Sequence, residues 1–274
     1  MKKIILVGCM VMMVLSVTCC GLSSAPQKKS NGYGVFLSLD HEDMESLYGY
    51  NQIVIDAQYF EKEDIQLLKQ SGTKVYTYLN LGSLENFRTY YAEFLDLTLD
   101  DYENWEEEKW VNVSDPRWQK FLGETLATQL LEKGVDGFFV DNCDVYYQYP
   151  TEEMYNGVTT ILKSLRGYGV DVIINGGDTY VSEYIARNNE ISGIMSGLNQ
   201  ESVYTGIDFS NHTFYQADKS DTKYYLSYIK KVEKLGGSIY LLEYATDKAL
   251  KKKIVKQCEK NNWNYYIADS LELD

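Results

Sequence analysis

Eight short apolar runs alternate with helical segments along most of this 274-residue chain. The runs are nearly continuous in apolar residues, which is typical of parallel strands buried on both faces. We expect strands over residues 33–40, 52–57, 74–82, 138–140, 170–175, 191–198, 238–245 and 263–269. The segments predicted to be helical are 62–70, 117–133, 151–168, 179–188, 223–235 and 247–260, with a short helix or turn over 42–48. This alternation predicts an α/β fold, a (β/α)8 TIM barrel forming a single domain over residues 33–274.

The first residues have the pattern of an export signal. Lys2 and Lys3 precede an apolar run, Ile4–Val17, that is short for a membrane span. We expect a lipoprotein-type signal peptide over residues 1–20, acylated at Cys20 or alternatively Cys19, with plain secretion as the other reading. Residues 21–32 are predicted to form a flexible polar tether. The protein is therefore expected outside the cell, at the cell surface on a lipid anchor or secreted, as a monomer.

Acidic residues dominate the charge. The chain has 40 Asp and Glu against 26 Lys and Arg, and loss of Lys2 and Lys3 with the signal leaves a net charge of −16. This charge disfavours nucleic acid as a partner and would attract a cationic one, although it also serves solubility. With two His, and three of the five Cys in the signal region, we expect no metal site, no cofactor and no Ser-His-Asp hydrolase.

Polar residues gather where the predicted strands end, and in a barrel these ends meet at one face. They are Asp40, Asp56, Asn80, Glu85, Asp141, Asp144, Asn175, Asp178, Glu201, Glu243 and Asp269. A pocket rich in carboxylates indicates acid/base chemistry on an uncharged bond, with glycoside hydrolysis the leading example. Each carboxylate taken singly could instead cap a helix or form a salt bridge.

The segment Gly134–Asp144 is central to this reading. A buried strand is followed directly by Asp141, Asn142 and Asp144. Glu201 follows the sixth predicted strand, and we expect the fourth and sixth strands to place Asp141 and Glu201 across the barrel mouth from each other. A long insertion, residues 83–110, should be functional or carry its own helix.

Five stretches together resemble glycoside hydrolase family 114, the endo-α-1,4-polygalactosaminidase-like barrels. They are Tyr78–Arg88, Val113–Trp118, Gly134–Asp144, Asn175-Gly-Gly and Gln200–Tyr204. The resemblance implies that Asp141 is the nucleophile or charge stabiliser and Glu201 the general acid/base, with Asp144 as an alternative to Asp141. It also implies substrate contacts from Tyr78, Glu85, Arg88, Asn142, Asp144, Asn175, Asp178 and Glu243.

The chain departs from the family pattern at two places. Gly82-Ser83 stands where the family often has Gly-Glu, and Asn175-Gly-Gly-Asp178 replaces the commoner Asn-Asn-Gly. The resemblance implies hydrolysis of an amino-sugar-containing polysaccharide or oligosaccharide, which would be cationic when partly deacetylated. A surface lipoprotein that binds carbohydrate without turnover is the alternative, and a scaffold rich in Tyr that binds a protein is a third reading.

Overall fold

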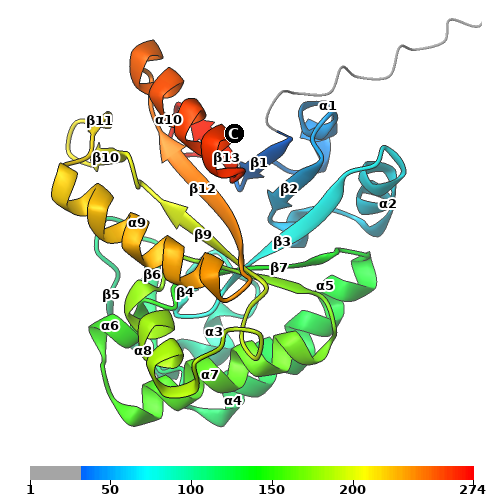
Figure 1. The fold of residues 1–274 in the computed structure, drawn as a ribbon. Helices are drawn as coiled ribbons and strands as arrows, with labels where there is room; N and C mark the ends of the chain where they lie inside the picture. The colour runs from blue at the N-terminus through cyan, green and yellow to red at the C-terminus, as the bar shows by residue number, and fades with distance from the viewer. Residues whose placement is uncertain (1–31) are drawn as a thin grey trace, which may run out of the picture.

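The computed structural model describes residues 32–274, and their strands form a barrel of eight parallel strands in the order β1-β2-β3-β7-β8-β9-β12-β13. Figure 1 shows the helices outside the strands. β1 and β13 contact each other, and Leu37 N donates to Leu273 O at 3.0 Å where the two ends of the sheet meet. The predicted (β/α)8 barrel is therefore confirmed. The barrel strands are β1 (Tyr33–Phe36), β2 (Gln52–Ile55), β3 (Lys74–Asn80), β7 (Gly137–Asp141), β8 (Asp171–Asn175), β9 (Gly197–Glu201), β12 (Ser238–Tyr244) and β13 (Asn264–Ala268).

Helices cover the outside of the barrel and begin at identifiable caps. Asp115 caps α4 with Pro116 at its first position, and Asp247 accepts from Leu250 N at the start of α10. The predicted helix 117–133 is continuous but passes through a π-helical stretch, Phe121–Leu126. The helices are α1 (Met44–Leu47), α2 (Lys62–Gln70), α3 (Tyr91–Phe94), α4 (Pro116–Lys120), α5 (Ala127–Lys133), α6 (Val145–Gln148), α7 (Glu152–Gly167), α8 (Asp178–Asn188), α9 (Lys219–Lys234) and α10 (Lys248–Asn261).

Alternate strand residues fill two separate buried layers. Tyr33 and Val35 of β1 belong to the cluster inside the barrel, whereas Phe36 belongs to the cluster between strands and helices. The same alternation in β12 directs Leu242 and Tyr244 inward. Residues of this inward parity at the carboxyl end of a strand therefore face the barrel mouth.

Two insertions build on the carboxyl ends of the strands. After β3, residues 83–111 form a three-stranded antiparallel sheet, β4 (Ser83–Glu85), β6 (Glu108–Val111) and β5 (Thr98–Asp101), and also carry α3. After β9, β10 (Thr205–Asp208) pairs with β11 (Thr213–Gln216) as a hairpin. The expectation that the first insertion carries a helix is confirmed, and its sheet was not predicted.

The sixth strand lies later than the sequence predicted. The apolar run 191–198 was expected to be the strand, but β9 spans Gly197–Glu201. Glu190 explains the difference, because its carboxylate accepts from Gly193 N at 2.9 Å, from Ser192 Oγ at 2.8 Å and from the Tyr184 hydroxyl. These bonds fix a turn at the start of the apolar run. The correction places Glu201 within the strand, as its last residue.

The residues predicted to form the export signal and most of the tether, and the predicted acylation at Cys20 or Cys19, lie outside the described residues. Among residues 32–274, no helix combines the length and apolar character needed to cross a membrane.

Candidate active site

A cavity of about 830 Å³ opens at the carboxyl ends of the barrel strands. Its floor comes from strand ends, and its walls come from the β4–β6 sheet, the β10–β11 hairpin and the C-terminal residues. The sequence-predicted residues that line it are Tyr78, Glu85, Arg88, Asp141, Asn142, Asp144, Asn175, Asp178 and Glu201. The structure therefore brings together every residue predicted to react with or contact substrate except Glu243, and two further strand-end residues, Asn80 and Asp269, do not line the cavity either.

Asp141 is the last residue of β7, and its carboxylate accepts three hydrogen bonds. Oδ1 accepts from Asn142 N at 2.9 Å and Asn175 Nδ2 at 2.9 Å, and Oδ2 accepts from the Tyr78 hydroxyl at 3.1 Å. Burial raises the pKa of Asp141, and these three donors act in the opposite direction. The following helix, α6, has Asp144 at its N-cap position and no side-chain cap bond. Asp141 is thus aimed at the cavity and does not cap a helix.

Glu201 ends β9 and receives two donors. Asn175 Nδ2 donates to Oε1 at 2.7 Å, and the Tyr244 hydroxyl donates to Oε2 at 2.9 Å. Burial, together with the nearby negative charge of Asp141, raises the pKa of Glu201 to about 7. A carboxyl with this pKa holds a proton for much of the time near neutral pH and can donate it.

Asn175 connects the two carboxylates. Its amide nitrogen donates to both, so Asp141 Oδ1 and Glu201 Oε1 can be no further apart than the sum of those two bond lengths, 2.9 and 2.7 Å. Asn199 Nδ2 donates to Asn175 Oδ1 at 2.7 Å, and the Tyr33 hydroxyl donates to Asn199 Oδ1 at 3.3 Å. This chain of bonds fixes which way the Asn175 amide points.

The relative placement of the pair differs from the prediction. Asp141 and Glu201 were expected across the barrel mouth from each other, but β7 and β9 both pair with β8 and are separated only by that strand. Since strand order in a barrel follows the chain, the fourth and sixth strands are next-but-one neighbours. The two carboxylates stand side by side over Asn175.

The turn after β8 depends on two glycines. Gly176 and Gly177 both have left-handed backbone, with φ of +62° and +63°, which a residue with a side chain adopts at a cost. Gly177 N donates to Asp144 Oδ2 at 3.2 Å. Burial raises the pKa of Asp144 to about 7, and the charges of Asp141 and Asp178 act in the same direction. Asp178 begins α8 and accepts a hydrogen bond from the Tyr224 hydroxyl.

Asn142 lines the cavity and bonds to three neighbouring side chains. It has left-handed backbone, with φ of +61°, and its Nδ2 donates to Asn80 Oδ1 at 3.0 Å and to Ser83 Oγ at 3.2 Å. The Tyr102 hydroxyl donates to its Oδ1 at 3.0 Å. Asn142 therefore couples β7 to the β4–β6 insertion, and its backbone nitrogen is one of the donors to Asp141.

Glu108 lines the cavity and was not predicted from the sequence. It lies on β6, where Ser83 Oγ and Asn80 Nδ2 both donate to Oε2. Burial raises its pKa to about 7. The family pattern often has Glu at the position of Ser83. In this chain the Glu108 carboxylate, on the neighbouring strand, bonds to Ser83 instead. No strand-end rule could find it, because it lies inside the insertion.

Glu85 and Arg88 form a buried ion network with Asp56. Arg88 donates through Nε and Nη2 to both oxygens of Glu85, at 2.9 and 2.8 Å, and through Nη1 to Asp56. All three side chains are almost fully buried, with exposures of 3–4%. Each buried charge therefore has a charged partner, and these bonds link the β4–β6 insertion to the end of β2 at one wall of the cavity.

Glu243 does not reach the cavity. Its carboxylate accepts from the backbone nitrogens of Val203 and Tyr204 and from Thr205 Oγ1 at 2.6 Å. The alternation of β12 explains this placement, because Leu242 and Tyr244 on either side point into the barrel and Glu243 points away. The prediction that Glu243 contacts substrate is corrected: the residue holds the connection that follows Glu201.

Comparisons with known proteins agree with this geometry. The model of glycoside-hydrolase family GH114 matches residues 35–270, which is most of the chain. The chain belongs to family GH114. The resemblance noted from the sequence is thereby confirmed, and the protein is a glycoside hydrolase. A search of the curated proteins gave no match.

Solved structures of GH114 relatives share the fold. The glycoside hydrolase domain of PelA from Pseudomonas aeruginosa is 16% identical, with a TM-score of 0.75 over 89% of this chain and 96% of that one. Aspergillus fumigatus Ega3, solved in complex with galactosamine, is 17% identical, with a TM-score of 0.69 over 92% and 96%. At these identities the similarity shows the fold alone.

Carboxyl groups dominate the lining of this GH114 cavity. Among residues 32–274, ten carboxyl side chains line it and Arg88, already paired, is its one Lys or Arg. The carboxyl residues are Asp40, Asp56, Glu85, Glu107, Glu108, Asp141, Asp144, Asp178, Glu201 and Glu272. Within the same part of the chain, no group of three or more His, Cys, Asp or Glu is arranged to hold a metal ion.

Aromatic rings surround the carboxylates. Phe87, Trp105 and Phe209 line the cavity and are 54%, 41% and 38% exposed. Trp105 and Phe209 also line a second pocket of about 350 Å³, which shares Leu271 and Glu272 with the first. Exposed rings beside a polar cleft suit the flat faces of sugar units.

Proposed function

We propose that this enzyme hydrolyses a polysaccharide that contains amino sugars, with Asp141 as nucleophile and Glu201 as general acid and then general base. The observation that carries the proposal is that the Asn175 amide donates to both Asp141 and Glu201, while the other hydrogen-bond donors of the two carboxylates differ. Neither carboxylate forms an ion pair with Lys or Arg among residues 32–274, which favours turnover over a purely binding role.

The separation of the carboxylates favours a retaining mechanism. Retaining enzymes hold the two groups about 5–5.5 Å apart, whereas inverting enzymes need about 6.5–9.5 Å. The shared donor sets an upper limit on the distance between Asp141 Oδ1 and Glu201 Oε1, the sum of 2.9 and 2.7 Å, and so short a limit suits the retaining arrangement better than the inverting one.

The two steps of a retaining mechanism can then be assigned to these residues. Glu201 gives its proton to the glycosidic oxygen as an Asp141 oxygen bonds to the anomeric carbon and the leaving sugar departs with that proton. Glu201, now ionised, takes a proton from water, whose oxygen attacks the anomeric carbon and releases Asp141. The Asn175 amide stays bonded to both carboxylates and limits their repulsion.

The substrate class follows from the cavity charge. Ten carboxyl side chains facing one paired cation would attract sugars that carry free amines. The structural relative Ega3 was solved with galactosamine, which is consistent with this class. The second pocket, which continues past Trp105 and Phe209, supports binding of a chain that extends beyond the cleavage point.

The test compares α-1,4-linked galactosamine oligomers with free amines against fully N-acetylated oligomers of the same length. We expect faster cleavage of the free-amine oligomers, loss of that preference in high salt, and a first product that keeps the α configuration by proton NMR. Equal rates on both oligomers would reject the cationic substrate, and a β product would reject the retaining mechanism.

We also propose that the enzyme is exported and lipid-anchored at Cys20 or Cys19, on the basis of Lys2, Lys3 and the apolar run that follows. Palmitate labelling in a bacterial host should be lost in Cys19→Ser/Cys20→Ser. Labelling that survives this change would reject the anchor.

A further inference from the structure

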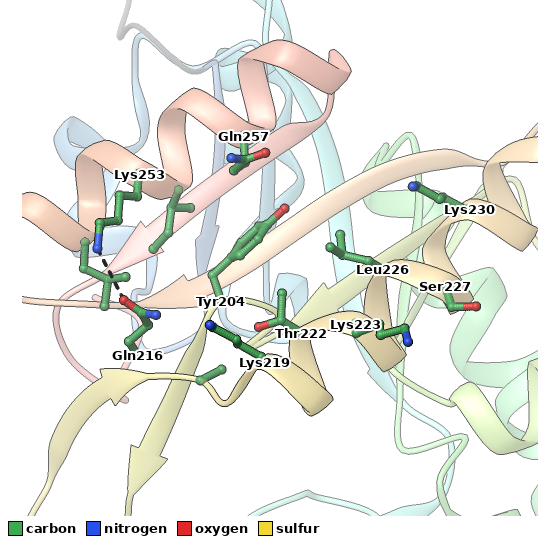
Figure 2. Close-up of a pocket in the computed structure, with 13 residues that line it drawn as sticks. Tyr204, Gln216, Lys219, Thr222, Lys223, Leu226, Ser227, Lys230, Lys253 and Gln257 are labelled. Atoms are coloured by element: carbon green, nitrogen blue, oxygen red, sulfur yellow. Dashed lines mark hydrogen bonds between the residues drawn. The ribbon is translucent and has the colours of Figure 1, made fainter.

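A third pocket, the flank pocket, has a volume of about 610 Å³ and lies on the side of the barrel, away from the carboxylates. It is formed where α9, α10 and the end of β11 meet. Figure 2 shows Tyr204 between the two helices, with Lys219 and Lys223 on one side and Lys253 on the other. Among residues 32–274, no residue lines both this pocket and the cavity that holds the carboxylates.

The charge of this pocket is opposite to that of the molecule. Within residues 32–274, four lysines line it, Lys219, Lys223, Lys230 and Lys253, and no Asp or Glu does. α9 and α10 together carry eleven of the 26 basic residues of the chain but only three acidic ones. A protein with a net charge of −14 has therefore collected positive charge on one face.

The ammonium groups are available to a ligand. Lys219, Lys223 and Lys230 form no hydrogen bond or ion pair with any of residues 32–274, and Lys253 Nζ makes one long contact, 3.4 Å, with Gln216 Oε1. Like charges held around one pocket repel one another, and an anion placed among them relieves that repulsion.

The remaining lining suits a sugar. The half-buried Tyr204 offers a ring, Leu226 and Ile254 give an apolar surface, and the hydroxyl and amide groups of Thr222, Ser227 and Gln257 can bond to sugar hydroxyls. These groups lie in a recess, whereas a membrane surface is met by protruding apolar side chains.

We propose that the flank pocket binds an anionic saccharide, one whose sugar units carry carboxylate or phosphate groups. The site is separate from the acidic cavity, which would repel such a ligand. Tyr204 is three residues beyond Glu201, and its backbone nitrogen is held by Glu243. The pocket is therefore attached to the strand that carries the general acid.

Calorimetric titration of the purified protein tests this without reading hydrolysis, so its outcome is independent of the proposed function. The probes are tetragalacturonate for carboxylate and a mannose phosphate oligosaccharide for phosphate, with neutral galactotetraose as the comparison. We expect saturable binding of at least one anionic saccharide and none of the neutral one. Lys223→Gln/Lys253→Gln should weaken that binding about tenfold, through two lost charge contacts.

The matched control is Lys231→Gln/Lys256→Gln, which removes one exposed lysine from each of the same helices outside the pocket. It should leave the affinity nearly unchanged. If both double variants weaken saccharide binding equally, the ligand is attracted by the general positive charge of the two helices, and the proposed binding in the pocket is rejected. Equal binding of galactotetraose, or polyphosphate binding as tightly as either anionic saccharide, would overturn the proposed ligand, as would binding only to vesicles of phosphatidylglycerol.

Discussion

Replacing Asn175 by Ala should shift both limbs of the pH–activity profile upward. In the wild type the Asn175 amide donates to Asp141 and to Glu201, and each bond favours the ionised form of its carboxylate. Removing it raises both pKa values. In the proposed mechanism the acidic limb follows ionisation of Asp141 and the alkaline limb follows loss of the Glu201 proton, so both limbs should move in the same direction.

The size of the shift follows from hydrogen-bond strength. A bond to a charged group contributes about 1.5–3 kcal/mol, and one pKa unit corresponds to about 1.4 kcal/mol. We therefore expect each limb to move by about one to two pKa units. Because the two groups interact, the limbs report apparent values of the pair.

The assay is the rate of galactosamine oligomer cleavage from pH 4 to 9 for three variants. Tyr244→Phe removes a donor from Glu201 alone and should move mainly the alkaline limb, whereas Tyr78→Phe should move mainly the acidic limb. Circular dichroism and thermal melts check that each variant is folded. An alkaline limb that stays in place or falls in folded Asn175→Ala would refute the shared-donor reasoning.

Three further predictions concern stability. Arg88→Met leaves Asp56 and Glu85 buried without their cation and should lower the free energy of unfolding in urea by about 3–5 kcal/mol. The control, Arg117→Met, removes an exposed ion pair and should lower it by less than about 1 kcal/mol. Equal losses in the two variants would contradict the role of burial. Burial raises the pKa of Glu243 from 4.5 to about 7. Between these two pH values the folded state holds a proton that the unfolded chain has lost, so stability falls as the pH rises from 4.5 to about 7 and levels off above that. Glu243→Gln should flatten this slope in melts across that range, and an unchanged slope would count against the prediction. Gly82→Ala should lower the melting temperature and activity together, since its added carbon would lie 1.9 Å from Asn142 O; a variant with normal activity and stability would show that the backbone there can yield.

The barrel could be predicted from the sequence because its signal is repeated. Eight apolar runs separated by helices leave few other folds, and Asp141 was found because it directly follows a buried run. The sixth strand was predicted too early in the sequence because its last three residues, Asn199 to Glu201, are polar, whereas the turn before the strand is apolar.

Strand alternation would have improved the site prediction. Asn199 and Glu201 share the inward parity of β9, and Tyr244 shares that of Leu242, so the donors that orient the pair could have been inferred. The same rule would have excluded Glu243. Glu108 could not be predicted as a cavity residue from the sequence, since its position depends on how β6 pairs with β4 inside the insertion.

The most direct test of the account is product release from α-1,4-linked galactosamine oligomers by the wild type, Asp141→Asn and Glu201→Gln. Each substitution keeps the shape of its side chain and removes the reacting carboxylate. We predict cleavage by the wild type and a loss of at least about 10²–10⁴-fold in each folded variant. Absence of cleavage by the wild type, or wild-type rates in both variants, would contradict the assignment of Asp141 and Glu201 as the catalytic pair.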